Sequence, residues 1–245
     1  MSPFANILDT TQLADLGPGP RPGILPQKEL DERLAEAFQV ANVPEDTKPL
    51  VRALVLLWHD QLDAAHTIAQ GIENVDGSYV HAIMHRREPD YGNAAYWFRR
   101  VGRHRAFPEL ARRVSELALR TGKSKLQQKL LRSGEWDPFA FVDACEQAAN
   151  GALSDEEEMY LREVQRMEFQ VLLDTLVAVD VRRLKLAVAA TARQPWRLFF
   201  AAEPADQRED HVAEQSQDNY GQAHADQDVA DILLGYKSQR ADEQV

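Results

Sequence analysis

Apolar residues recur at spacings of three and four along most of this chain, and this periodicity constrains the fold more than any other feature. Leu30, Leu34 and Phe38 share one helical face in the region 27–42, and a longer run repeats the pattern after Ser154. β-Branched residues do not alternate with polar residues over any useful length, which argues against strands. The sequence therefore predicts an all-α fold.

Prolines, glycines and capping residues divide this pattern into helices. Pro49 suits the first turn of a helix, Asp90 can cap one, and Gly102 can end one. Ser154 and Glu157 have the spacing of a capping box. We expect an irregular multi-helix bundle of about seven or eight helices. The helical segments are predicted at 27–42, 48–70, 78–87, 91–101, 108–120, 125–132, 139–149, from 154 onward, and at 181–193.

Composition suggests three regions. Residues 1–26, with four prolines and three glycines between positions 17 and 26, form an extended N-terminal arm. The arm either packs on the domain through Ile24 and Leu25 or is a flexible leader. Residues 27–201 form the helical domain. Residues 202–245 hold 11 acids and 3 bases and are expected to be a disordered acidic C-terminal tail.

The tail ends in a short apolar motif at residues 229–236, where Val229, Ile232 and Leu233 share a helical face. This motif either docks in the groove of a protein partner or folds back on its own domain. No apolar run approaches the roughly 18 residues of a membrane span, so we expect no membrane partner. With no signal peptide expected and Cys145 the single cysteine, a cytoplasmic location is favoured.

The net charge of −11 is unevenly distributed. Residues 86–132 hold 13 bases and 4 acids, a net of +9, so a basic segment lies within an acidic chain. Global acidity argues against a dedicated nucleic-acid binder, although the basic segment can still hold anions locally.

Four of the seven histidines lie between positions 58 and 102. His59, Asp63 and His66 fall at i, i+4 and i+7 on one predicted helix, which places them on one face. His81, His85 and Glu88 repeat that spacing on the next helix. If these two helices are antiparallel neighbours, their polar faces meet. Imidazole is a good ligand for zinc and other divalent transition metals. The predicted metal ligands are His59, His66, His81, His85 and Glu88.

Two other interpretations of this cluster remain open. A carboxylate beside an imidazole can orient it for acid–base catalysis, and His59, Asp63, His81 and His85 are the candidate catalytic residues. The histidines can instead form a structural network that holds two helices in register. No HExxH motif and no paired ExxH motif is present to decide between them.

Polar groups beside the histidines favour a small anionic molecule as the ligand. Arg86 and Arg99 offer planar donors to a carboxylate or phosphate, and Asp90 and Asn93 lie at the same helix break. The alternatives are that the arginines form surface ion pairs and that Asp90 caps its helix. We expect Trp97 to pack in the core.

The segment HAIMHRREPDYGNAAYWFRRVG, at 81–102, resembles the signature of a family of helical proteins, HAIxHRREPDxxNAxYWFRRVG. With the segments GEWDPFAFVDACEQA and EVQRMEFQVLLD, the resemblance covers residues 54–174. It implies a helical fold and no particular activity.

Three functional interpretations follow. The leading one is a His/Asp/Arg-lined site for a small anionic ligand, with metal-assisted or acid–base chemistry if the protein is an enzyme. The second is a non-enzymatic interaction module with a structural histidine cluster. The third and least favoured is nucleic-acid binding. The chain lacks GxGxxG, GxSxG and CxxC motifs, and the GKS at 122–124 lacks the first glycine of a phosphate-binding loop.

Overall fold

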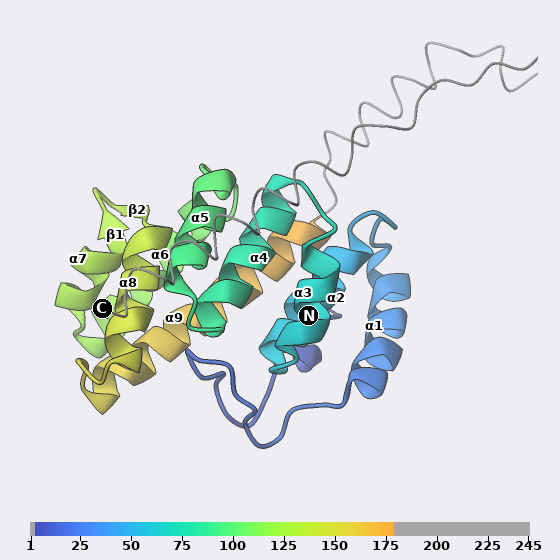
Figure 1. Cartoon of the computed structure of the whole chain (residues 1–245), viewed down its shortest axis with the longest axis horizontal. Helices are drawn as coiled ribbons and strands as arrows, with labels where there is room; N and C mark the ends of the chain where they lie inside the picture. Colours follow the sequence, from blue (N-terminus) through green and yellow to red (C-terminus); the bar gives the residue numbers. More distant parts are fainter. Residues whose placement is uncertain (1–2, 179–245) are drawn as a thin grey trace, which may run out of the picture. The chain divides into compact units, whose positions relative to one another are not determined.

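The computed structural model describes residues 3–178, and this part of the chain is all-α, as predicted (Figure 1). It contains nine α-helices, slightly more than the seven or eight expected, because one predicted helix is divided in two. A short 3-10 helix, Ala5–Ile7, precedes them. The α-helices are α1 (Gln27–Ala41), α2 (Lys48–Trp58), α3 (Leu62–Ala69), α4 (Val75–Arg87), α5 (Tyr91–Val101), α6 (Phe107–Thr121), α7 (Ser124–Leu130), α8 (Pro138–Ala149) and α9 (Asp155–Val177).

The two central helices are α4 and α9. Every residue of α4 from Gly77 to Arg87 is buried, as expected for a helix that is enclosed by neighbours on all sides. Its closest partners are α5 and α3, whereas α9 contacts α2, α6 and α8. In Figure 1, α9 runs behind α4 from the α8 end toward the α2 end of the described part. The core is therefore continuous from α1 to α9.

A buried ion pair joins these two helices. The Arg86 guanidinium of α4 donates to both oxygens of Glu168 on α9, at 3.1 and 2.5 Å, and lies 4.3 Å from the centroid of the Phe141 ring. The Tyr79 hydroxyl donates to the same carboxylate at 3.2 Å. Neither charged side chain of the pair has any exposed surface, so each depends on the other for its compensation.

The predicted helix over 48–70 is interrupted at residues 59–61, which corrects the sequence interpretation. Asp60 adopts a left-handed backbone conformation with φ of 59°. Its buried carboxylate accepts hydrogen bonds from the Arg21 backbone N–H at 2.9 Å and from the Arg87 guanidinium at 2.7 Å. These long-range contacts stabilise a turn that the local apolar periodicity does not reveal. As a result, His59 and His66 do not lie on one continuous helix.

The start of α4 also differs slightly from the prediction. The helix begins at Val75 rather than Ser78, because the Asn74 side chain accepts the Gly77 N–H at 2.7 Å as an N-cap. At Gly77 the chain passes so close to the preceding loop that a Cβ atom would lie 2.2 Å from the Ile72 carbonyl oxygen. A glycine is therefore required where α4 leaves that loop.

Two elements confirm the predicted boundaries. The helix break at Pro89 is present, and the Asp90 carboxylate caps α5 by accepting the Asn93 N–H at 3.1 Å. The capping box of Ser154 and Glu157 opens α9.

A short β-hairpin was not predicted. Leu131–Arg132 (β1) pairs in antiparallel register with Glu135–Trp136 (β2). Both loop residues, Ser133 and Gly134, have positive φ, which is the pattern of a tight two-residue hairpin turn. Strands of two residues are too short to produce an alternating sequence pattern.

The N-terminal arm packs on the helices. Phe4, Ile7, Leu8, Ala14 and Leu16 are buried in the common core, whereas Ile24 and Leu25 are half-buried. The arm is also held by polar contacts, since the Arg87 guanidinium donates to the Gly17 carbonyl at 3.0 Å. Of the two open alternatives, the structure supports the packed arm.

The remaining predictions for the C-terminal region lie outside the described residues. They are the helix at 181–193, the acidic tail at 202–245 and the apolar motif at 229–236. None of the helices in the described part has both the length and the hydropathy needed to cross a lipid bilayer.

Candidate metal centre

Three histidines meet between α3 and α4. His81 and His85 lie one turn apart on α4, and His66 comes from α3, which packs against it. One ligand nitrogen of each ring can be chosen so that all three lie within 4.8 Å of one another. The ring centroids are 4.8 Å apart for His66 and His81, 4.8 Å for His81 and His85, and 5.4 Å for His66 and His85.

His81 is the central member of this cluster. Its side chain is buried, and both ring nitrogens are enclosed without a hydrogen-bond partner. One face of the ring stacks on Trp97 at a centroid distance of 4.0 Å. Burial, and secondarily the neighbouring His85 and His66, lower the pKa of His81 to about 4. The ring is therefore neutral at pH 7, the form in which imidazole binds a metal ion.

His85 is oriented by a carboxylate. Its Nδ1 lies 3.2 Å from Glu88 Oε2, so Nδ1–H donates to Glu88 in the tautomer that this contact favours. In that tautomer Nε2 carries the free lone pair. Burial lowers the pKa of His85, and the Glu88 carboxylate partly opposes this effect. Glu88 thus lies behind a ligand ring, in the position from which carboxylates commonly fix metal-binding histidines.

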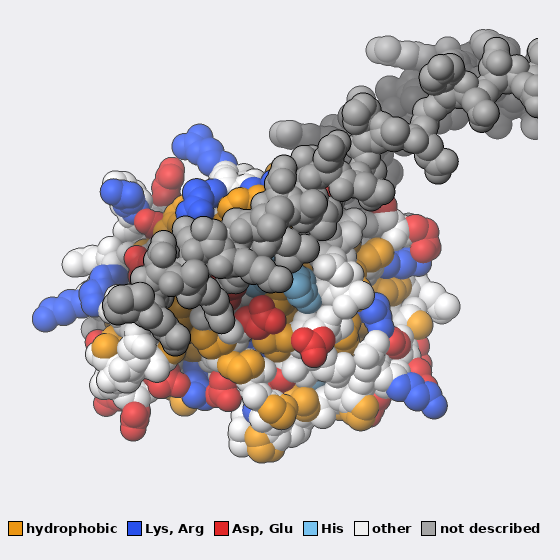
Figure 2. All heavy atoms as spheres, viewed as in Figure 1, with side chains coloured by type: hydrophobic (Ala, Val, Ile, Leu, Met, Phe, Trp, Pro, Cys, Tyr) orange, Lys and Arg blue, Asp and Glu red, His pale blue; other side chains and the backbone are white. Residues whose placement is uncertain are grey.

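The three histidines differ in burial, since His66 is half-buried while His81 and His85 are buried. A histidine side chain is visible on the face shown in Figure 2, with acidic side chains beside it. Asp63, one turn before His66 on α3, is exposed.

His59 lies apart from this cluster, unlike in the sequence prediction. It follows the last residue of α2 and is fully buried under the N-terminal arm. Its Nδ1 accepts the Leu25 N–H at 3.1 Å, and its Nε2 lies 2.8 Å from the Ile7 carbonyl oxygen. Both ring nitrogens are engaged by the backbone, so His59 anchors the arm and has no lone pair left for a metal.

The predicted anion-binding residues have different surroundings, and of these Asp90 lies near the cluster, where its charge acts to raise the pKa of His85. Arg86 is fully buried and is committed to Glu168. Asp90 caps α5, where Asn93 is half-buried in the first turn, and Arg99 is exposed near the end of the same helix. The Arg86 placement excludes it from contact with a ligand at the surface.

Trp97 packs against the core, as predicted, and it also contacts the histidine cluster, which the sequence did not indicate. It is half-buried, forms one wall of the cluster against His81, and lies 5.2 Å from the Arg100 guanidinium carbon. The signal that could have found it is the pairing of α4 with α5, which places position 97 beside position 81.

A shared metal ion would require the three rings to turn, because the His81 and His85 rings are stacked at an interplanar angle of 15°. In tetrahedral zinc, donor nitrogens at about 2.0–2.1 Å from the metal lie roughly 3.3 Å from one another. The observed spread of up to 4.8 Å therefore closes if the rings turn inward by a total of about 1.5 Å. His66, with a half-exposed ring, has the most freedom to make that movement.

Comparisons with protein-family models, with curated proteins and with solved structures gave no match to this chain.

Proposed function

We propose that this chain binds a divalent transition-metal ion, with Zn²⁺ the best match, through His66, His81 and His85. The observation that carries the proposal is His81, whose two ring nitrogens are buried without partners between two other imidazoles. Buried polar atoms nearly always have a partner, and leaving one unpaired costs free energy. A metal ion bound to the ring would offset that cost.

The choice of metal follows from the donor set. Neutral imidazole nitrogens suit Zn²⁺, Cu²⁺, Ni²⁺ and Fe²⁺, whereas Mg²⁺ and Ca²⁺ prefer oxygen ligands. Three protein ligands are the number found in catalytic zinc sites, which keep the fourth position for water or substrate. Glu88 serves as the outer carboxylate that orients His85, and it is not a direct ligand in this proposal.

The open position sets the chemistry that the site can perform. A bound metal ion polarises a carbonyl or phosphoryl oxygen and lowers the pKa of bound water toward neutrality. It also adds positive charge, which favours a small anionic ligand there. Asp63 lies one helical turn from His66 and is the nearest acid on α3 to accept a proton. The proposed reaction class is metal-assisted hydrolysis or proton transfer on a small anionic molecule.

The structure gives less support to the interpretation of the basic segment as a phosphate-binding face. Six of its 13 bases take part in ion pairs in the described part of the chain. These six are Arg86, Arg87, Arg105, Arg112, Arg113 and Lys123. Their charges are already compensated by neighbouring acids, so fewer bases are available for nucleic acid or for an acidic protein partner.

The test is metal binding by the full-length protein after chelator treatment and desalting. Titration with Zn²⁺, followed by calorimetry and by metal analysis after dialysis, should give one ion per chain. His81→Ala and His85→Ala should each lose that stoichiometric binding. Circular dichroism of each variant checks that the helical fold persists.

His104→Asn is the matched control, because His104 is also buried but its ring is bonded to Asp76 Oδ1 at 2.8 Å and to the Ala106 N–H at 3.1 Å. This variant should keep one Zn²⁺ even if its stability falls. The proposal is wrong if the wild-type chain binds no ion, or if His81→Ala binds Zn²⁺ as well as the wild type does.

A further inference from the structure

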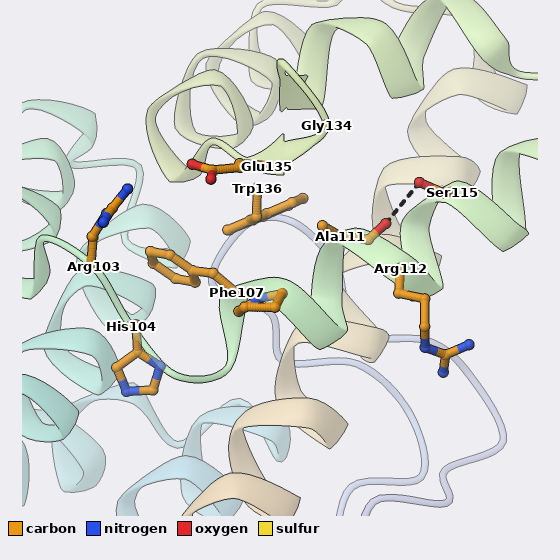
Figure 3. A pocket seen from close by; sticks show the side chains of 10 residues that line it. Arg103, His104, Phe107, Ala111, Arg112, Ser115, Gly134, Glu135 and Trp136 are labelled. Carbon is orange, nitrogen blue, oxygen red and sulfur yellow. Dashed lines mark hydrogen bonds between the residues drawn. The ribbon is translucent and has the colours of Figure 1, made fainter.

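A second hollow, separate in its residues from the histidine cluster, lies between α6 and the β-hairpin. Its volume is about 590 Å³, within the range typical of sites for small organic ligands. It is lined by the connection between α5 and α6, by the first half of α6 and by β2 (Figure 3). None of the three clustered histidines contributes to its lining.

Two aromatic side chains form its apolar walls. Phe107 of α6 is half-buried, and Trp136 of β2 is almost fully buried and packed edge-on against Phe141 at 5.3 Å between centroids. Figure 3 shows the Phe107 and Trp136 rings next to each other at the centre of the pocket. The indole N–H of Trp136 is buried without a hydrogen-bond partner, so the fold leaves a donor in this wall unpaired.

The charged residues of the lining differ in how they are held. Arg112 pairs with Glu109 and Glu116 on α6, and in Figure 3 its guanidinium points away from the two rings. Arg103 and Glu135 are exposed, and neither takes part in an ion pair with any residue of the described part. With Arg112 already paired, the lining offers a ligand one positive group, Arg103, and one negative group, Glu135.

His104 and Ser115 offer little to a ligand, although both line the hollow. The His104 ring is bonded on both nitrogens, and the Ser115 hydroxyl donates to the Ala111 carbonyl at 2.9 Å and accepts from Gln127. Among the lining residues, the Arg103 guanidinium is therefore the positively charged group that is not already paired. It lines the same pocket as Phe107 and Trp136.

We propose that this pocket binds a small planar aromatic molecule with one negatively charged group. The flat body would lie against Phe107 and Trp136, where aromatic rings prefer offset or edge contacts. The anionic group would accept hydrogen bonds from Arg103, whose planar fork matches a carboxylate or sulfonate. The exposed Glu135 carboxylate would repel the same anionic group, so its removal should raise the affinity for the anion.

The probe is 8-anilinonaphthalene-1-sulfonate, an aromatic anion with a flat naphthalene ring whose fluorescence rises in an apolar site. With the folded full-length protein it should show saturable binding to one site per chain. Arg103→Gln should weaken the affinity about tenfold, the effect of one lost charge-assisted contact. Phe107→Ala should weaken it by a similar factor. Glu135→Gln should strengthen it, because it removes a like charge.

Arg120→Gln is the control for Arg103→Gln. Arg120 is an exposed arginine of α6 that does not line the pocket. The variant should bind the probe as the wild type does. Thermal melts of every variant, followed by circular dichroism, exclude binding to partly unfolded protein.

Three outcomes would overturn the proposal. They are the lack of saturable binding, binding that Arg103→Gln and Phe107→Ala leave unchanged, and weaker binding in Glu135→Gln. Thioflavin T, an aromatic cation, tests whether the pocket prefers the opposite charge. If it binds more tightly than the sulfonate and loses affinity in Glu135→Gln, the pocket selects cations instead.

Discussion

The buried histidines of this protein fall into two groups, according to whether their ring nitrogens have hydrogen-bond partners. His59 and His104 each have both ring nitrogens engaged, so they are satisfied structural residues. His81 is equally buried and has neither nitrogen engaged. Sequence spacing could not make this distinction, because it places residues on a helix face without showing what their ring atoms meet.

The lowered pKa values of His59 and His81 predict that the chelator-treated protein loses stability in mild acid. Burial is the main cause for both, and His81 falls from its usual 6.5 to about 4. As pH falls below 6.5, the unfolded chain takes up these protons before the folded chain does. The free energy of unfolding should therefore decrease, by about 1 kcal/mol for His81 alone between pH 7 and pH 5.5.

Urea denaturation at several pH values, with chelator present, measures this dependence. In His81→Phe the slope between pH 7 and pH 5.5 should be shallower, because one of the protons is no longer taken up on unfolding. A free energy of unfolding that stays constant or rises over this interval would contradict the assignment.

Loss of the buried Arg86–Glu168 pair should cost far more stability than loss of an exposed ion pair. In Glu168→Gln the shape of the side chain is kept, but the fully buried Arg86 loses its counter-charge. We expect a loss of about 3–5 kcal/mol in the free energy of unfolding, from chemical denaturation. Glu29→Gln removes the acid of the exposed Arg33–Glu29 pair and should change it by less than about 0.5 kcal/mol. Equal effects would contradict the buried-charge argument.

At the scale of secondary structure, local signals predicted most helix ends correctly. Pro49 lies in the first turn of α2, Asp90 caps α5, Gly102 follows its last residue, and Ser154 caps α9. Each of these acts through its own backbone or side chain, within a few residues of the helix end. Such contacts join residues that are close in sequence, so the local sequence is enough to predict them.

The break between α2 and α3 was missed for the opposite reason. Asp60 turns the chain because its carboxylate meets Arg21 and Arg87, which are 39 and 27 positions away. No local residue signals this break, since the apolar spacing continues across it. The same limit applies to His66, whose role depends on the direction in which α3 leaves that turn.

The capping box predicts a graded effect on α9. The Ser154 hydroxyl accepts the Glu157 N–H at 3.3 Å, and Glu157 accepts the Ser154 N–H at 3.0 Å. Ser154→Ala should lower the free energy of unfolding by about 1 kcal/mol, and Ser154→Gly by only a few tenths of that unit. Thermal and urea denaturation compare the two variants. A larger loss with glycine than with alanine would show that the hydroxyl cap is not what stabilises this helix end.

For the whole molecule, the all-α class and a polar centre near residues 58–102 were predictable, and the exact ligand set was not. The i, i+4 pair of His81 and His85 is visible in the sequence. His66 was named with them on the expectation that the two helices are neighbours, whereas the contact of Trp97 with His81 required the pairing of α4 with α5. His59 does not take part in the cluster, because both of its ring nitrogens are bonded to backbone groups of the N-terminal arm.

The measurement that tests the central claim most directly is zinc K-edge X-ray absorption on the full-length protein loaded with one equivalent of Zn²⁺. A three-histidine centre should give a first shell of nitrogen and oxygen atoms at about 2.0–2.1 Å, with outer-shell scattering from three imidazole rings. His66→Ala should reduce that number to two rings while Zn²⁺ remains weakly bound. A first shell of oxygen alone, or an imidazole contribution that persists unchanged in His81→Ala, would contradict the proposed three-histidine centre.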